Sequence, residues 1–372
     1  MSKYQITLTP VDKFFFGGDM TFQVGNNEND EFNKKYSSYI IKSSMYPQQT
    51  SLLGMLRFLI LRNGGNAVFK DGRIVDNELA KELIGKRSFS VNDNHEENQF
   101  GMIGSLTHVW IRKTEKGKEE NLEFEPFFRE LSFNKSGLYN LQGINIPEIP
   151  KEEYDPKDGI KTRLTGDIEL KDVFKEDRRI GIDRDIKTGK TGEKGDHALF
   201  KQISYRFAIK VENKGDNKEK DNVRYCFVFN AVVDDCIPLE NYSGQLVTVG
   251  GDNSQFVIGI SKDVRQQDVA KQINNAVYLL SPTYLSPEEA REAKFAITQV
   301  MPFRFLKTEV DKDVSYNIIN KGKNKSLNRS KKFELYAPGS VFYFKDKEQK
   351  QKFIEYIESK KEFRQIGYNE FK

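Results

Sequence analysis

Residues 43–62 read SSMYPQQTSLLGMLRFLILR. Either Thr50 or Ser51 can cap a helix here, and the apolar run 52–61 predicts that the helix continues to the end of this stretch. A helix that is apolar nearly all round is typical of the interior of a protein. We therefore expect this helix to lie in the core, buried on the side formed by Leu52, Leu56 and Leu59.

Strand signals lie on both sides of this helix in the sequence. Polar and apolar residues alternate over 4–8, and stronger strand signals cover 203–211 and 223–233. The polar stretch ENKGDNKEKDN joins the last two, which predicts a hairpin. Later residues predict a helix that begins at Pro287 and an amphipathic helix over 347–360. Alternating strands and helices with frequent hairpins favour an α+β fold of split βαβ units.

The chain has 372 residues, which is enough for two units of this kind. We place the boundary near residue 200, between an N-terminal domain over 1–200 and a C-terminal domain over 201–372. Residues 145–200 are poor in apolar periodicity and rich in Gly, Asp, Lys and Arg. This composition predicts a long basic insertion that contains a hairpin.

Composition excludes several classes of protein. Aromatic residues make up 12% of the chain, which disordered chains do not reach, so a folded protein is expected. The net charge of +4 is low for a protein that coats duplex DNA, but it allows a focused patch that binds few phosphates. Cys226, Cys236 and three scattered histidines lack the clustering of a zinc site, so we expect no metal and no cofactor.

The location of the protein also follows from the composition. Few cysteines suit a reducing cytoplasm. The N-terminal residues MSKYQITLTP lack the layout of a signal peptide, and no apolar run approaches about 18 residues. We expect a cytoplasmic protein that does not enter a membrane.

One face of the predicted helix carries residues suited to an anion. Thr50, Gly54 and Arg57 recur at helical spacing, and a helix start attracts negative charge. Gly54 lets a ligand backbone approach closely, and Arg57 offers a forked donor to phosphate. Polar residues around the helix start can donate to phosphate or ribose, namely Ser43, Ser44, Gln48, Gln49 and Ser51. The alternative is an ordinary capped core helix with one Arg salt bridge.

Three further segments are candidates for phosphate binding. The insertion carries Arg178, Arg179, Arg184, Lys187, Lys190 and Lys194, partly offset by acidic neighbours. A later run without acidic neighbours carries Lys321, Lys323, Lys325, Arg329, Lys331 and Lys332. Flexible cations bind a phosphate chain without reading its sequence. Gly339-Ser340 then offers backbone N–H groups that could cradle phosphate. Solvated loops and a simple turn are the alternatives for these segments.

Ordered motifs along the chain resemble a known family. They are PVDKFFFGGDMTF at 10–22, the helical stretch at 43–61, RIGIDRDIKTGKTGEKGDHALF at 179–200, Val249-Gly250-Gly251-Asp252 and YAPGSVFYF at 336–344. In this order they resemble a RAMP-superfamily subunit of the type III-B (Cmr) CRISPR effector complex. The opening turn has Gly17-Gly18 where the family pattern usually carries Arg.

The resemblance implies two ferredoxin-like (RRM-like) domains and a thumb-like hairpin within the basic insertion. It implies a non-catalytic subunit for antiviral defence that binds the 5′ tag of the CRISPR guide RNA (crRNA). The implied protein partners are the large polymerase-palm subunit and other RAMP subunits of the complex.

Two other classes remain open from the sequence. A metal-independent endoribonuclease that matures guide RNA could use His108 or His197 as its general acid or base. A structural module unrelated to RNA is the third possibility. A catalytic palm is disfavoured, because neither Asp19 nor Asp252 is followed by a second acidic residue that could help to hold metal ions. We therefore expect no catalytic residues.

Overall fold

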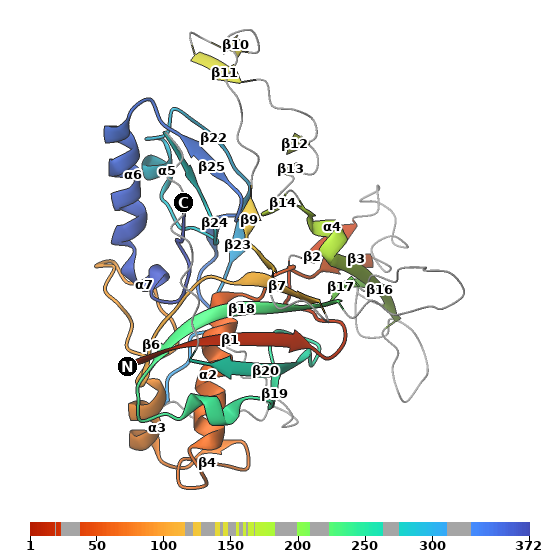
Figure 1. The fold of residues 1–372 in the computed structure, drawn as a ribbon, viewed down its shortest axis with the longest axis vertical. Coiled ribbons are helices and arrows are strands. Elements are labelled where there is room, and N and C mark those ends of the chain that lie inside the picture. The colour runs from red at the N-terminus through yellow and green to blue at the C-terminus, as the bar shows by residue number, and fades with distance from the viewer. Residues whose placement is uncertain are drawn as a thin grey trace, which may run out of the picture.

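The computed structural model shows a mixed α+β protein with mostly antiparallel strands and few helices (Figure 1). It describes residues 1–18, 20–23, 38–115, 122–127, 138–141, 144–147, 154–155, 159–160, 163–166, 168–182, 199–208, 223–262, 275–310 and 329–372.

A seven-stranded antiparallel sheet forms the centre of the described fold. Its order is β19-β20-β1-β18-β7-β8, and β6 continues beside β18 beyond β7. The strands are β1 Ser2–Pro10, β6 Ile103–Leu106, β7 Trp110–Glu115, β8 Leu122–Phe124, β18 Val223–Val233, β19 Leu246–Thr248 and β20 Gln255–Ser261. The sheet contains strands from both sides of residue 200, because β1 pairs with β18 and β20. A domain boundary near residue 200 would therefore cut through this sheet.

Helix α2 (Gln49–Asn63) lies against one face of this sheet (Figure 1). The predicted helix is confirmed, and Leu52, Leu56 and Leu59 are at most 1% exposed. Burial of each such side chain contributes roughly 1.5–3 kcal/mol to folding. They pack into one large core with apolar residues from β1, β18 and β20.

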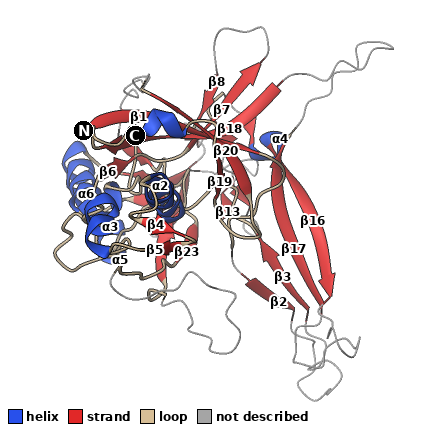
Figure 2. Ribbon diagram, turned by 90° about the horizontal axis from the view of Figure 1, so that it is seen from below, coloured by secondary structure: helices blue, strands red, loops and turns tan. Residues whose placement is uncertain are grey.

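A second sheet has the order β16-β17-β3-β2 and extends away from the helices (Figure 2). Its strands are β2 Met20–Gln23, β3 Ser38–Lys42, β16 Phe174–Ile182 and β17 Leu199–Phe207. The hairpin predicted from 203–211 and 223–233 is wrong, because β17 pairs with β16 and β3 while β18 belongs to the central sheet. The polar stretch between them connects two sheets, which the local pattern does not reveal.

The C-terminal part contains a small sheet backed by a helix (Figure 1). The sheet is β21 Ala276–Tyr278, β25 Val341–Tyr343 and β22 Phe295–Ile297, with α5 (Pro287–Ala290), α6 (Lys347–Ser359) and α7 (Lys361–Arg364) nearby. The predicted amphipathic helix is confirmed as α6, whose Phe353 and Ile357 are fully buried. The predicted start at Pro287 is confirmed too, where Ser286 and Glu289 form a capping box.

Shorter elements complete the described chain. They are β4 Phe69–Lys70, β5 Arg73–Ile74, α3 Asn77–Ile84, β9 Pro126–Phe127, β10 Leu138–Leu141, β11 Ile144–Pro147, β12 Tyr154–Asp155, β13 Gly159–Ile160, β14 Arg163–Leu164, β15 Ile168–Glu169, α4 Leu170–Val173, η1 Leu239–Tyr242, β23 Val300–Phe303 and β24 Phe333–Tyr336. Within the described ranges, no helix has the length and apolar character needed to cross a membrane.

Candidate nucleic-acid interface

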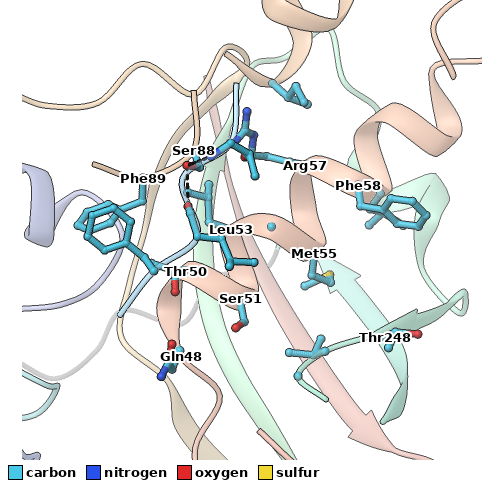
Figure 3. A pocket seen from close by; sticks show the side chains of 18 of the residues that line it. Gln48, Thr50, Ser51, Leu53, Met55, Arg57, Phe58, Ser88, Phe89 and Thr248 are labelled. Carbon is cyan, nitrogen blue, oxygen red and sulfur yellow. Dashed lines mark hydrogen bonds between the residues drawn. The ribbon is translucent and has the colours of Figure 1, made fainter. Parts of the chain in front are cut away.

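A groove with a volume of about 1930 Å³ runs along helix α2 (Figure 3). The opposite walls come from the β4–β5 turn, from β19, from residues 301–310 and from the end of the basic run at Arg329 and Lys332. Eight residues that the sequence suggested for phosphate or ribose binding line it, namely Ser44, Gln48, Thr50, Ser51, Gly54, Arg57, Arg329 and Lys332.

The surface that α2 turns toward the groove differs from the rest of the helix. Ser51, Gly54, Phe58 and Arg62 follow one another at helical spacing and line the groove. Every leucine, isoleucine and methionine of the helix is buried, whereas Gly54, Phe58 and Arg62 are exposed. A Cβ atom built on Gly54 would meet no atom of the described chain within 4 Å. The packing of the protein therefore does not require glycine at this position.

The groove is lined by six cationic side chains and one carboxylate. The cations are Arg57, Arg62, Arg73, Arg304, Arg329 and Lys332, and the carboxylate is Glu309. Glu309 lies 3.6 Å from the guanidinium of Arg87, which is outside the groove. In the part of the chain that the structure describes, none of these cations except Arg57 has a hydrogen bond or an ion pair through its side chain. Such a surface attracts anions.

Arg57 is held more firmly than its neighbours. Its guanidinium donates to the backbone carbonyl of Gly85 over 3.1 Å, and the side chain is partly buried. Gly85 ends helix α3 with a positive φ of 77°, where a Cβ would come 2.2 Å from the carbonyl of Gln99. Arg57 therefore joins α2 to the turn after α3 and presents a fixed charge to the groove.

The start of α2 is less open to an anion than the sequence predicted. The backbone N–H groups of Gln49 and Thr50 lie beside the buried hydroxyl of Tyr368. Burial raises the pKa of Tyr368, and these neighbours act in the opposite direction. The cationic character of the site therefore comes from the side chains on the groove surface.

Two predicted residues near the helix start have structural roles. Ser43 is buried, accepts from the Phe16 N–H over 2.8 Å and donates to the Ser44 carbonyl over 2.7 Å. Gln49 is buried and donates to the Gly367 carbonyl over 3.4 Å. Neither side chain lines the groove.

The other predicted segments lie away from the groove or outside the described residues. Arg178 and Arg179 are exposed on β16, where Arg178 pairs with Glu176 at 2.9 Å. The sequence predicted free N–H groups at Gly339 and Ser340, but both groups donate to backbone carbonyls, those of Leu279 and Ala337. A turn beside a sheet satisfies its own N–H groups in this way. Arg184, Lys187, Lys190, Lys194, Lys321, Lys323 and Lys325 lie outside the described residues.

Several groove residues were not predicted from the sequence. Arg62 and Phe58 continue the exposed line of α2, so an extension of the 50–54–57 spacing could have found them. Arg304 lies between the buried Phe303 and Phe305, and this alternation marks it as outward-facing. No local signal indicates that Arg73 belongs to the same surface.

Two glycine turns that are far apart in the sequence meet at the groove. Gly17, Gly18 and Gly250 all line it. The N–H of Gly251 donates to the Phe15 carbonyl over 2.7 Å, which ties the two turns together. Gly250 has a φ of 88°, and a Cβ there would lie 2.5 Å from the same carbonyl, so the contact requires glycine.

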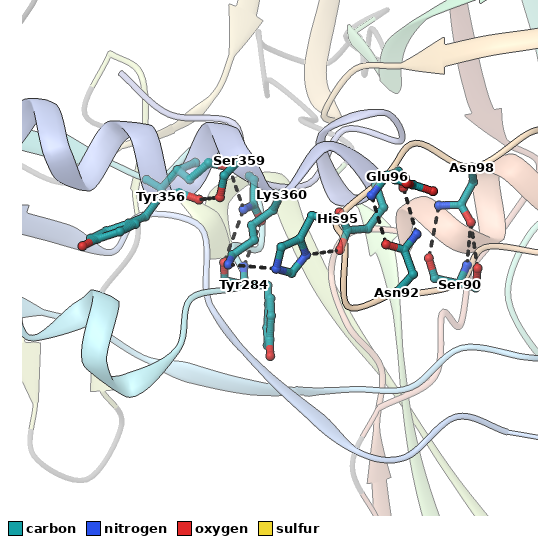
Figure 4. A network of polar contacts seen from close by, with 12 residues as sticks. Ser90, Asn92, His95, Glu96, Asn98, Tyr284, Tyr356, Ser359 and Lys360 are labelled. Atoms are coloured by element: carbon teal, nitrogen blue, oxygen red, sulfur yellow. Dashed lines mark hydrogen bonds and ion pairs between the residues drawn. The ribbon is translucent and has the colours of Figure 1, made fainter.

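The histidines serve other contacts. His108 is buried beside Trp110, and its Nε2 lies 3.4 Å from Glu125. His95 lies between Glu362 and Lys360, at 2.8 Å and 3.3 Å, in a polar network that joins the loop 90–98 to the C-terminal helices (Figure 4). Neither side chain lines the groove. His197, the other candidate acid or base, lies outside the described residues.

The chain has the fold of a CRISPR effector component. A solved chain from the type III-B Cmr-beta complex bound to cognate target RNA and AMPPnP matches it with a TM-score of 0.50. The identity is 13%, and the match covers 99% of this chain and 95% of that one. A chain from the Cmr-beta complex bound to cognate target RNA matches with a TM-score of 0.47, again at 13% identity, covering 99% and 96%.

Comparison by sequence gives the family. No curated protein matches the chain. The family described as CRISPR-associated protein (Cas_Cmr3) matches residues 6–156 and 148–371, which together span nearly the whole sequence. The chain therefore belongs to the Cas_Cmr3 family of CRISPR-associated proteins.

Proposed function

We propose that this chain is a non-catalytic RNA-binding subunit of a type III-B effector complex and that its groove holds the 5′ tag of the guide RNA. The observation that carries the proposal is the excess of six cations over one carboxylate along the groove. This excess is larger than the net charge of the whole chain, +4. A mildly basic protein that concentrates its cations in one place can hold a short stretch of phosphates.

The shape of the groove supports RNA as the ligand. The exposed backbone at Gly54 allows a phosphate chain to approach α2 closely. Arginines predominate among the cations, and guanidinium groups bind phosphate through two parallel hydrogen bonds. The solved relative of the same fold comes from a complex that is bound to RNA.

The wider assignment follows from the family. Within the cytoplasm, the subunit would act with the large polymerase-palm subunit and with other RAMP subunits of the Cmr complex. Its two halves would correspond to ferredoxin-like units. The proposed role is binding without cleavage, and the test below examines both.

The test replaces Arg304 and Arg329 with Gln in the reconstituted complex and measures retention of tagged RNA across a salt series. A matched double variant, Arg224→Gln with Arg291→Gln, removes the same charge from exposed sites that do not line the groove. The groove variant should bind more weakly, with a slope against log salt that is flatter by about one to two. Equal binding by both variants and the parent protein at every salt concentration would refute the proposal, as would cleavage of the RNA.

A further inference from the structure

The groove surface of α2 carries an aromatic side chain whose exposure the fold does not explain. Phe58 is 42% exposed, although every other large apolar residue of the helix is buried. Its ring meets that of Phe69 edge to face, with centroids 5.6 Å apart and an interplanar angle of 87°. A single contact of this kind supports the ring but leaves at least one of its faces uncovered by Phe69.

The position one turn before Phe58 leaves space on the same face of the helix. That residue is Gly54, where an added Cβ would meet no described atom within 4 Å. Glycine inside a helix costs about 1 kcal/mol relative to alanine. The chain thus keeps an unfavourable residue where its own packing has room for a larger one, and a flat ligand group beside Phe58 would use that room.

Positively charged side chains lie before and after Phe58 along the helix, and they indicate a negatively charged ligand. Arg57 precedes Phe58 and Arg62 follows it by one turn, and all three line the groove. Exposed aromatic rings set among cations are the arrangement with which proteins hold single-stranded nucleic acid, because every base has a face that stacks. Val75, Leu246 and Leu306 are exposed at the same groove and could instead meet a protein. The excess of cations over carboxylates among the lining residues favours a polyanion.

We propose that Phe58 is a platform on which one unpaired base of the bound RNA stacks, with Gly54 leaving room for that nucleotide. This inference rests on the proposed function and goes further, because it requires an unpaired base at α2. It also identifies Phe58 as a residue in contact with the RNA that phosphate binding alone does not need.

The experiment compares Phe58→Leu and Phe58→Trp in the reconstituted complex, with 5′-tagged RNAs in which one nucleotide at a time is abasic. Phe58→Leu keeps an apolar side chain but removes the ring, so it should weaken binding by about 5- to 150-fold, while Phe58→Trp should bind like the parent protein. One abasic position should weaken binding by the parent protein and cause no further loss in Phe58→Leu. In the parent protein, 2-aminopurine at that position should lose fluorescence on binding.

The outcomes separate this inference from the proposed function. If Phe58→Leu binds every RNA like the parent protein while the Arg304 and Arg329 variant is impaired, stacking is refuted and the RNA groove stands. If both variants bind normally, the groove itself is in the wrong place. If Phe58→Leu folds like the parent protein but no longer enters the complex, the ring meets a protein subunit and the inference is overturned. Unfolding temperatures of the variants serve as the control for folding.

Discussion

At the scale of single residues, a substitution at Gly54 should have opposite effects on the stability of the protein and on its binding of RNA. Gly54→Ala should stabilise the protein by about 1 kcal/mol, because the position is exposed, helical and open. The same methyl group should weaken binding of tagged RNA, because it enters the space that the nucleotide is expected to use. Thermal unfolding and RNA retention measure the two effects.

A control for helix propensity is available in α6. Gln351→Ala changes an exposed position of that helix, which does not line the groove, so RNA binding should stay unchanged. If Gly54→Ala gains stability and binds RNA like the parent protein, no ligand approaches the helix at this point.

Glu125 gives a second prediction, which concerns pH. Burial acts to raise the pKa of Glu125, but the nearby His108 and the ion pair with Lys372 outweigh it and lower the pKa to about 2. A carboxyl group whose pKa is depressed by folding contributes stability above its unfolded pKa, and this contribution is lost as the pH falls toward the folded value. The contribution here is on the order of 3 kcal/mol at neutral pH and should disappear between about pH 4.5 and 2.

The variant that tests this is Glu125→Gln. Its free energy of unfolding, measured with denaturant, should be below that of the parent protein at pH 7, and the difference should shrink as the pH falls through this window. A difference that stays constant from pH 7 to pH 3 would show that the ionised carboxylate of Glu125 beside Lys372 and His108 is not its source.

At the scale of elements, α2 combines a structural face with a binding face. Leu56→Ala should cost about 2–5 kcal/mol, because the side chain is fully buried against the central sheet. Phe58→Ala, two residues later, should cost much less, because the ring is 42% exposed. Denaturant midpoints of the two variants test this, and equal losses would mean that Phe58 is part of the core.

The elements also show what local sequence can predict. The apolar run around Leu56 and the apolar periodicity around Phe353 are enough to predict α2 and α6, because each helix has to bury those side chains wherever it packs. The pairing of strands was not predictable in this way. The segments that form β17 and β18 have strong strand patterns, but their partners are β16 and β3 in one case and β1 and β7 in the other.

At the scale of the whole molecule, the site is assembled from distant parts of the chain. Thr50, Gly54 and Arg57 could be grouped from sequence because helical spacing places them on one face. Arg73, Arg304, Arg329 and Lys332 join them only through the tertiary fold. The sequence suggested that the N–H groups of Gly339 and Ser340 could bind phosphate. These groups instead donate to the carbonyls of Leu279 and Ala337, a pairing that only the folded structure reveals.

The central claim is that the guide's 5′ tag lies along α2. The most direct test is a reconstituted complex with 4-thiouridine at single positions of the tag, irradiated and mapped by mass spectrometry. We expect crosslinks to peptides that contain α2 and residues 301–310, which form opposite walls of the groove. Crosslinks that fall on α6 or on the β16–β17 hairpin, with both walls unlabelled at every tag position, would contradict the claim.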